Sequence, residues 1–204
     1  MFSSKQKITL AISVAIIITG IIIFAQATNP TPVKIVYKDW DPKKPVAADN
    51  FKGKVPSGAT ASATLYWTLD TSWTFKRVLE DDACFDIPKF KVVAKMNLTK
   101  SWAKSSPSKE LLNHEQRHLD IAEYQARLLE NKLNKEFGKK IPCSADFTET
   151  EKKIDEMREQ SRKDTQKMQD QYDKEVKTNG RIDPTKQKEW DKKIDDLLKK
   201  TKRS

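Results

Sequence analysis

The spacing of apolar residues changes near residue 100, and this change constrains the fold more than any other feature of the chain. Between residues 61 and 98, apolar and polar residues alternate, which is typical of half-buried strands. In KFKVVAKMNL, every second residue from Phe90 to Leu98 is apolar and lysines lie opposite; TLYWTLD shows the same alternation around Trp67. We therefore expect a small antiparallel sheet in this part of the chain.

Beyond residue 106, apolar residues recur every three or four positions, as on one face of a helix. Ser106 can cap this helix ahead of Pro107, and Gly138 ends it. We expect a second, charge-rich helix over about 148–177 and a third over about 184–199. The sequence therefore predicts an α+β fold, in which the sheet packs on the first helix and a long charged helix and a C-terminal helix follow.

Residues 1–27 resemble a targeting segment. Lys5 and Lys7 precede the apolar run ITLAISVAIIITGIIIF, and AQA, ending at Ala27, has the shape of a signal-peptidase site. We expect the chain to be exported, periplasmic or secreted after cleavage near Ala27. The alternative is an uncleaved N-terminal helix that anchors the chain in the membrane.

The remaining chain of about 177 residues is long enough for one domain with a core. We expect residues 28–60, rich in Pro, Lys and Gly, to form an extended tether with one short strand, and 61–200 to form the domain. Loss of the first 27 residues removes two lysines and lowers the formal charge from +10 to +8. Such a charge favours an anionic envelope surface as a partner. Aromatic residues do not interleave with the basic ones, so we expect no nucleic-acid partner.

Two cysteines, Cys84 and Cys143, are present in the chain. In an oxidising compartment, such a pair is most simply one disulfide. Closing a loop of about 60 residues would contribute roughly 4 kcal/mol on the chain-entropy model. Two thiolate metal ligands fit poorly, because neither cysteine has another Cys or His at ligand spacing.

Both histidines of the chain lie in LLNHEQRHLDIAEYQARLL, where His114 and His118 flank Glu115 in an HExxH motif. On a helix, residues four apart lie within about 40° of each other and one turn apart, so two imidazoles can share a Zn²⁺ ion. Glu115 is rotated by about 100° and can act as general base on a zinc-bound water. The alternative is two surface histidines on a polar helix.

The third metal ligand must come from another element. The motif lacks the downstream Gly and His of metzincins. Asp120 and Glu123 point away from the histidine face, where a carboxylate could instead orient an imidazole N–H. We expect the third ligand to be a carboxylate of the second helix.

Several blocks carry a resemblance to a known family: HEQRHLDIAE, preceded by CFDIPKFKVVAKMNLTKSW and followed by YDKEV and QKEW. Over roughly 60–195, the chain resembles the bacterial predicted secreted zinc-dependent proteases known as domain of unknown function 922. The resemblance implies a small zincin-like α+β domain with peptidase activity. It also implies His114 and His118 as zinc ligands and Glu115 as the base.

The chain departs from this family at one point. The family pattern continues from Tyr-Asp-x-Glu into Thr-x-His-Gly, whereas this chain has YDKEVKTNG and no histidine there. We therefore predict Glu175 as the third ligand, with Asp173 as the alternative; a degraded site is the other interpretation. Tyr172 could donate to an oxyanion or pack in the core.

Two functions follow from these patterns. The first is an exported zinc metallopeptidase that hydrolyses a peptide or protein substrate, which would bind along the sheet edge near the strand ending at Leu98. The second is a non-catalytic, envelope-associated binding or scaffold protein on a degraded zincin-like fold.

Overall fold

The computed structural model describes residues 34–203, apart from 74–75, 81–82, 87–88, 139 and 143–146. At 76–80, 83–86, 140–142 and 147 it describes the backbone alone. The predicted targeting segment lies outside the described residues. Among the helices that are described, none is long and apolar enough to cross a membrane.

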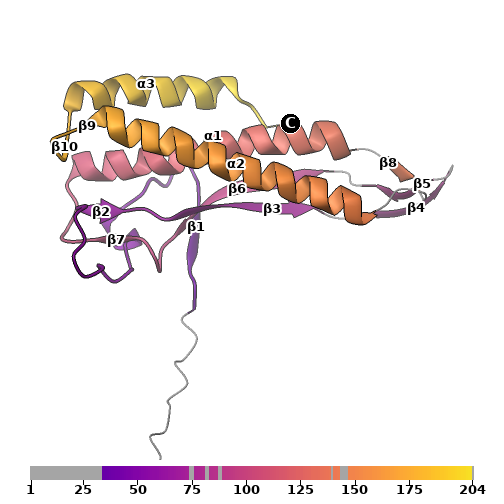
Figure 1. The fold of residues 1–204 in the computed structure, drawn as a ribbon, viewed down its shortest axis with the longest axis horizontal. Coiled ribbons are helices and arrows are strands. Elements are labelled where there is room, and N and C mark those ends of the chain that lie inside the picture. Colours follow the sequence, from indigo (N-terminus) through magenta and orange to yellow (C-terminus); the bar gives the residue numbers. More distant parts are fainter. Residues whose placement is uncertain are drawn as a thin grey trace, which may run out of the picture. The chain divides into compact units, whose positions relative to one another are not determined.

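The central strand of the main sheet is β6 (Phe90–Asn97), which pairs antiparallel with β1 (Tyr37–Asp39) on one side and β3 (Trp67–Trp73) on the other (Figure 1). Alternate residues of β6, from Phe90 to Met96, are fully buried, so the predicted alternation is confirmed. The other described strands form small antiparallel pairings: β2 (Ala63–Thr64) with β7 (Trp102–Ala103), β5 (Ala83–Asp86) with β4 (Lys76–Glu80) and β8 (Lys140–Pro142), and β9 (Lys177–Thr178) with β10 (Arg181–Ile182).

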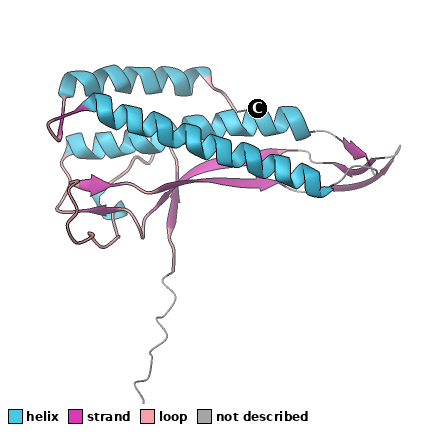
Figure 2. Ribbon diagram, viewed as in Figure 1, coloured by secondary structure: helices cyan, strands magenta, loops and turns pink. Residues whose placement is uncertain are grey.

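Three long helices follow the sheet in sequence: α1 (Lys109–Phe137), α2 (Phe147–Val176) and α3 (Pro184–Lys200). They lie on one side of the main sheet (Figure 2), and α1 contacts β6, α2 and α3. One apolar cluster joins the sheet to α1 and the start of α2, and a second joins all three helices around Tyr172 and Trp190. The α+β fold is therefore confirmed.

The start of α1 differs by two residues from the predicted start. Ser108, not Ser106, caps the helix, because its side chain accepts a hydrogen bond from the Leu111 N–H at 3.1 Å. Gly138 ends the helix as predicted, and its N–H donates to the Asn134 carbonyl. The last two helices begin and end within one residue of their predicted bounds.

The described part of the expected tether, from Lys34 to residue 60, belongs to the folded unit. It contributes β1, the short 3₁₀ helix η1 (Ala48–Asn50) and the buried Val46. The Val46 N–H donates to the side-chain oxygen of Gln116 on α1 at 2.7 Å. This segment therefore packs against α1 and is part of the folded domain.

The predicted disulfide lies outside the described side chains. Cys84 falls in β5, where only the backbone is described, and Cys143 is not described. In the register of β5 and β8, Ala83 lies opposite Pro142. The disulfide stays a prediction.

Side chains of α1 form hydrogen bonds with the part of the β6 edge that β1 does not pair with. β1 pairs only with residues 95–97, so backbone groups earlier in β6 need other partners. The Val92 N–H donates to Glu130 at 2.9 Å, and the amide of Asn134 bonds both the N–H and the carbonyl of Phe90. These bonds fix α1 on the sheet, and they explain why polar residues are buried there.

Arg203 holds the buried carboxylates of α1 in place. Its guanidinium donates to both oxygens of Glu123 at 3.0 Å, to Glu130, and to the Val92 carbonyl. Glu123 is fully buried and Glu130 nearly so. Arg203 is therefore a structural counter-ion for these two carboxylates.

We predict that Arg203→Ala lowers the free energy of unfolding by about 3 kcal/mol, because it leaves Glu130 buried without a counter-ion. Lys202→Ala, which removes an exposed neighbouring charge, is the matched control and should have little effect. Urea unfolding followed by circular dichroism measures both. Equal midpoints for the two variants would contradict this role.

Candidate metal centre

The two histidines of α1 face α2, where they meet one carboxylate. Both rings are buried, with centroids 5.0 Å apart and planes nearly perpendicular. Nε2 of His114 lies 3.0 Å, and Nε2 of His118 3.2 Å, from the same Oδ1 of Asp173. One ligand atom from each residue lies within 4.8 Å of the others, so the group could hold a metal ion.

Asp173, and not the predicted Glu175, is the carboxylate at this site. Glu175 accepts hydrogen bonds from Trp190 Nε1 at 2.9 Å and from Gln171 Nε2 at 2.8 Å. Two residues along a helix correspond to a rotation of about 200°, so the two carboxylates cannot face the same neighbour. Within the group that could hold a metal ion, the candidate third ligand is therefore Asp173, the predicted alternative to Glu175.

Asp173 is held in its ionised form. Burial alone would raise the pKa of this carboxyl, but its contacts with His114, His118 and Lys177 outweigh burial and hold the pKa well below its usual range. Nζ of Lys177 lies 2.7 Å from Oδ1. Asp173 therefore acts only as an acceptor of hydrogen bonds or as a metal ligand.

Two glutamine amides fix which nitrogen of each imidazole faces Asp173. Nδ1 of His114 lies 3.2 Å from Oε1 of Gln187 on α3, and Nδ1 of His118 lies 3.1 Å from Oε1 of Gln169 on α2. Each amide N–H₂ donates elsewhere: Gln187 to Asp191 and Gln169 to the His118 carbonyl. Because both Oε1 atoms accept, both Nδ1 atoms donate, which leaves Nε2 of each ring as the nitrogen that could bind a metal ion.

Sequence patterns gave no role to Gln169 or Gln187. The one signal for Gln169 is its place three residues before Tyr172, which puts it beside the apolar stripe of its helix. Gln187 begins QKEW, one of the blocks that carry the family resemblance, but its role could not be predicted because its partner His114 lies 73 residues away.

Tyr172 packs behind the histidines. Its ring stacks on His114 with centroids 4.8 Å apart, and its edge contacts His118 at 5.1 Å. Its hydroxyl donates to Oε1 of Gln187 at 2.9 Å, and burial raises its pKa, so it stays protonated. Of the two predicted roles, packing fits this position, because the hydroxyl is committed to Gln187.

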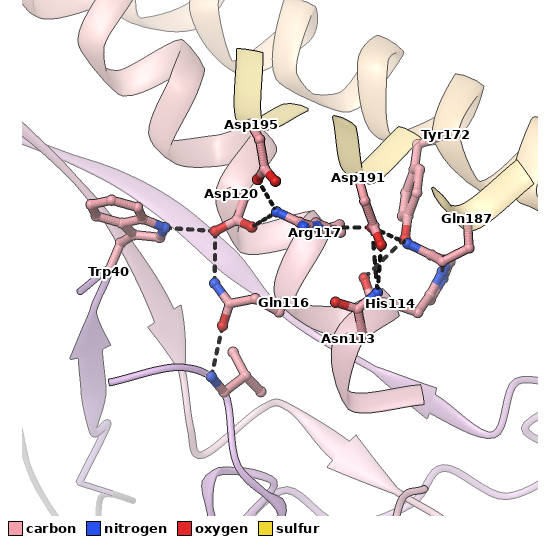
Figure 3. Close-up of polar contacts among 11 residues, drawn as sticks. Trp40, Asn113, His114, Gln116, Arg117, Asp120, Tyr172, Gln187, Asp191 and Asp195 are labelled. Carbon is pink, nitrogen blue, oxygen red and sulfur yellow. Dashed lines mark hydrogen bonds and ion pairs between the residues drawn. The ribbon is translucent and has the colours of Figure 1, made fainter. Parts of the chain in front are cut away.

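Asp120, predicted as a group that could orient an imidazole, lies on another face of α1 (Figure 3). It accepts hydrogen bonds from Trp40 Nε1 at 2.7 Å and from Arg117 at 3.0 Å. Arg117 also bonds Asp191 and Asp195 of α3. Asp120 therefore joins the N-terminal segment to α1, and Arg117 joins α1 to the residue that orients Gln187.

Glu115 lies on the wall of a cavity of about 680 Å³, which it shares with His118 and Asp173. The cavity lies between α2 and the segment that includes β2 and β3. Only 3% of Glu115 is exposed, and among the described residues its carboxylate has no hydrogen-bond or ion-pair partner. The Glu115 carboxylate therefore faces the open cavity, and an unpaired carboxylate on a cavity wall beside two histidines is a candidate functional group.

The sheet edge at this cavity is β3. The sequence placed substrate near the strand that ends at Leu98, but that strand is β6, which lies in the middle of the sheet. β3 pairs with β6 on one side, and no described strand pairs with its other side. Thr71 of β3 lines the cavity, and its buried hydroxyl has no partner there.

Residues 47–181 match the family described as "Bacterial protein of unknown function (DUF922)", and the chain belongs to this family. No curated protein and no solved structure matches the chain. The match covers α1, α2 and β9, ends at the first residue of β10, and does not reach α3. Gln187 therefore contacts His114, and Asp191 contacts Gln187, from outside the matched region.

We predict that Gln187→Ala weakens divalent-metal binding by about 10- to 100-fold, because it removes the acceptor that holds Nδ1 of His114. Lys188→Ala changes an exposed neighbour on the same helix and is the matched control. Zinc titration against a chromogenic chelator gives both affinities, and circular dichroism verifies folding. Equal affinities in the two variants would show that the amide does not orient the ring.

Proposed function

We propose that this chain is an exported zinc-dependent metallopeptidase, in which His114, His118 and Asp173 bind the metal and Glu115 is the general base. The observation that carries the proposal is the buried, unpartnered Glu115 on the cavity wall beside this ligand set. Two imidazole nitrogens and one carboxylate are the protein ligands of a common class of catalytic zinc site, which keeps a further position open.

The residues present fit a zinc ion and hydrolytic chemistry. Bound zinc supplies a Lewis acid that polarises a carbonyl and lowers the pKa of water. Gln169 and Gln187 keep the Nε2 lone pairs turned towards the ion site. Glu115, with no polar partner of its own, is free to accept a proton from the attacking water and to deliver it to the leaving amine.

The free edge of β3 favours a peptide over a small molecule as substrate. Its backbone N–H and C=O groups have no described strand partner on the cavity side, so an extended peptide can pair with them as an added strand. Such pairing would carry the peptide past Glu115 and the metal ligands. The opposite wall is polar: Arg158 pairs with Asp155 and Arg162 with Glu159.

The proposed location follows from the first 27 residues and the basic charge. The charged n-region, apolar run and small-x-small sequence support export, with cleavage near Ala27 or retention as an anchor. The formal charge, +10 for the full chain and +8 without the two lysines of the first 27 residues, favours contact with an anionic envelope surface.

We predict that Glu115→Gln keeps one zinc per chain but lowers peptide hydrolysis by about 10²- to 10⁴-fold, as expected for loss of a general base. Glu110→Gln, an exposed glutamate on the same helix, should retain both zinc and activity. His118→Ala should lose the metal. Elemental analysis after dialysis measures zinc, and cleavage of a peptide library measures activity.

Two outcomes would contradict the proposal. A wild-type protein that binds no zinc would leave the non-catalytic, envelope-associated binding or scaffold protein as the function. Zinc binding without hydrolysis of any peptide in the library would retain the metal centre but remove the peptidase activity.

A further inference from the structure

Lys177 lies directly at the candidate metal centre. Its Nζ is 2.7 Å from Oδ1 of Asp173, the same oxygen that lies 3.0 and 3.2 Å from the two histidine Nε2 atoms. No other lysine or arginine among the described residues pairs with Asp173. The side chain of Lys177 lines the cavity and is 35% exposed.

The ammonium group offsets the negative charge of the site. The amides of Gln169 and Gln187 accept hydrogen bonds from the two Nδ1 atoms, so it is Nε2 of each ring that is turned towards Asp173. Both Nε2 atoms and the ammonium group therefore meet at one oxygen, Oδ1 of Asp173. Lys177 places its ammonium group at the oxygen that a metal ion would also use.

We propose that Lys177 is a tethered competitor for the metal ion: its ammonium occupies Asp173 in the metal-free protein and must leave Oδ1 when a metal binds. The inference deepens the regulation of the proposed site and rests on its metal ligands, but not on peptide hydrolysis. Because two positive charges at one carboxylate oxygen repel each other, Lys177 weakens metal binding.

The structure allows the Lys177 side chain to move away from Asp173 while the Lys177 backbone stays in place. Lys177 is the first residue of β9 and pairs with Ile182 of β10 across the turn at Asn179 and Gly180. Both turn residues have positive φ, of 51° and 75°, which suits a two-residue hairpin turn and fixes the hairpin. Nζ has no other partner among the described residues, and the flexible four-carbon stem can turn into the open cavity.

The simpler interpretation is an ordinary Asp–Lys pair at i,i+4, which would contribute little to stability and nothing to metal binding. The two interpretations differ in what they predict for metal affinity. A surface pair can be removed without changing the zinc dissociation constant, whereas removal of a competitor makes it smaller.

The test compares zinc dissociation constants of the full chain and three variants, measured by competition with a chromogenic chelator. We expect Lys177→Met to bind zinc about tenfold more tightly than the wild type. Lys177→Arg, which keeps the charge, should stay within about twofold of the wild type. Lys174→Met removes an exposed lysine of α2 and controls for the general loss of positive charge. Visible absorption of Co²⁺ at limiting metal gives an independent second measurement.

Each outcome separates this inference from the proposed function. If Lys177→Met is the only variant that binds zinc more tightly than the wild type, both the competitor role of Lys177 and the zinc site of the proposed function are supported. If the wild type binds zinc and Lys177→Met binds it equally or more weakly, Lys177 is not a competitor, but the proposed function stands. The same conclusion follows if Lys174→Met tightens zinc binding as much as Lys177→Met does. Binding by Lys177→Met but not by the wild type supports the competitor and overturns a zinc enzyme in the chain as it is. If neither the wild type nor Lys177→Met binds zinc, both the competitor role of Lys177 and the proposed function are overturned.

Discussion

The hydrogen bond from the Val92 N–H to the buried carboxylate of Glu130 is the contact on which the arrangement of the other elements depends. Together with the Asn134 amide, it fixes both the position and the rotation of α1 on β6. His118 lies twelve residues before Glu130, a rotation of about 120°, so the histidine faces other helices while Glu130 faces the sheet. One helix thereby provides hydrogen-bond partners for the edge of β6 and carries both candidate metal-binding histidines, which explains why so many of its polar residues are buried.

The sequence predicted the features that depend on local periodicity. Alternation around Phe90 and the three-to-four spacing after residue 106 indicated the sheet and α1, and the spacing of His114 and His118 placed both on one face. The third ligand depended on packing instead. Relative to Tyr172, Asp173 lies at about +100° and Glu175 at about −60°, so the two carboxylates flank the same apolar stripe. Only the placement of α1 and α3 decides which flank faces the histidines.

The residues whose roles depend on the packing of other elements had no sequence signal for those roles. Gln169, Gln187, Lys177 and Arg203 lie in charge-rich stretches, where most side chains are solvated. Their roles arise because a neighbouring element buries an imidazole or a carboxylate that needs a partner. Two of them, Gln187 and Arg203, also lie beyond residue 181, where the family match ends. Membership of the family therefore does not by itself account for the groups that orient His114 and neutralise Glu130.

The long sequence separations within the metal centre also have a consequence for the order of folding. His114 lies 59 residues from Asp173 and 73 from Gln187, so no single hairpin or helix can assemble the ligand set. Closing such loops is slow compared with forming local structure, and the set is complete only after α1, α2 and α3 have docked. A metal ion that binds only this native arrangement does not nucleate folding. It instead lowers the free energy of the finished state and so slows its unfolding.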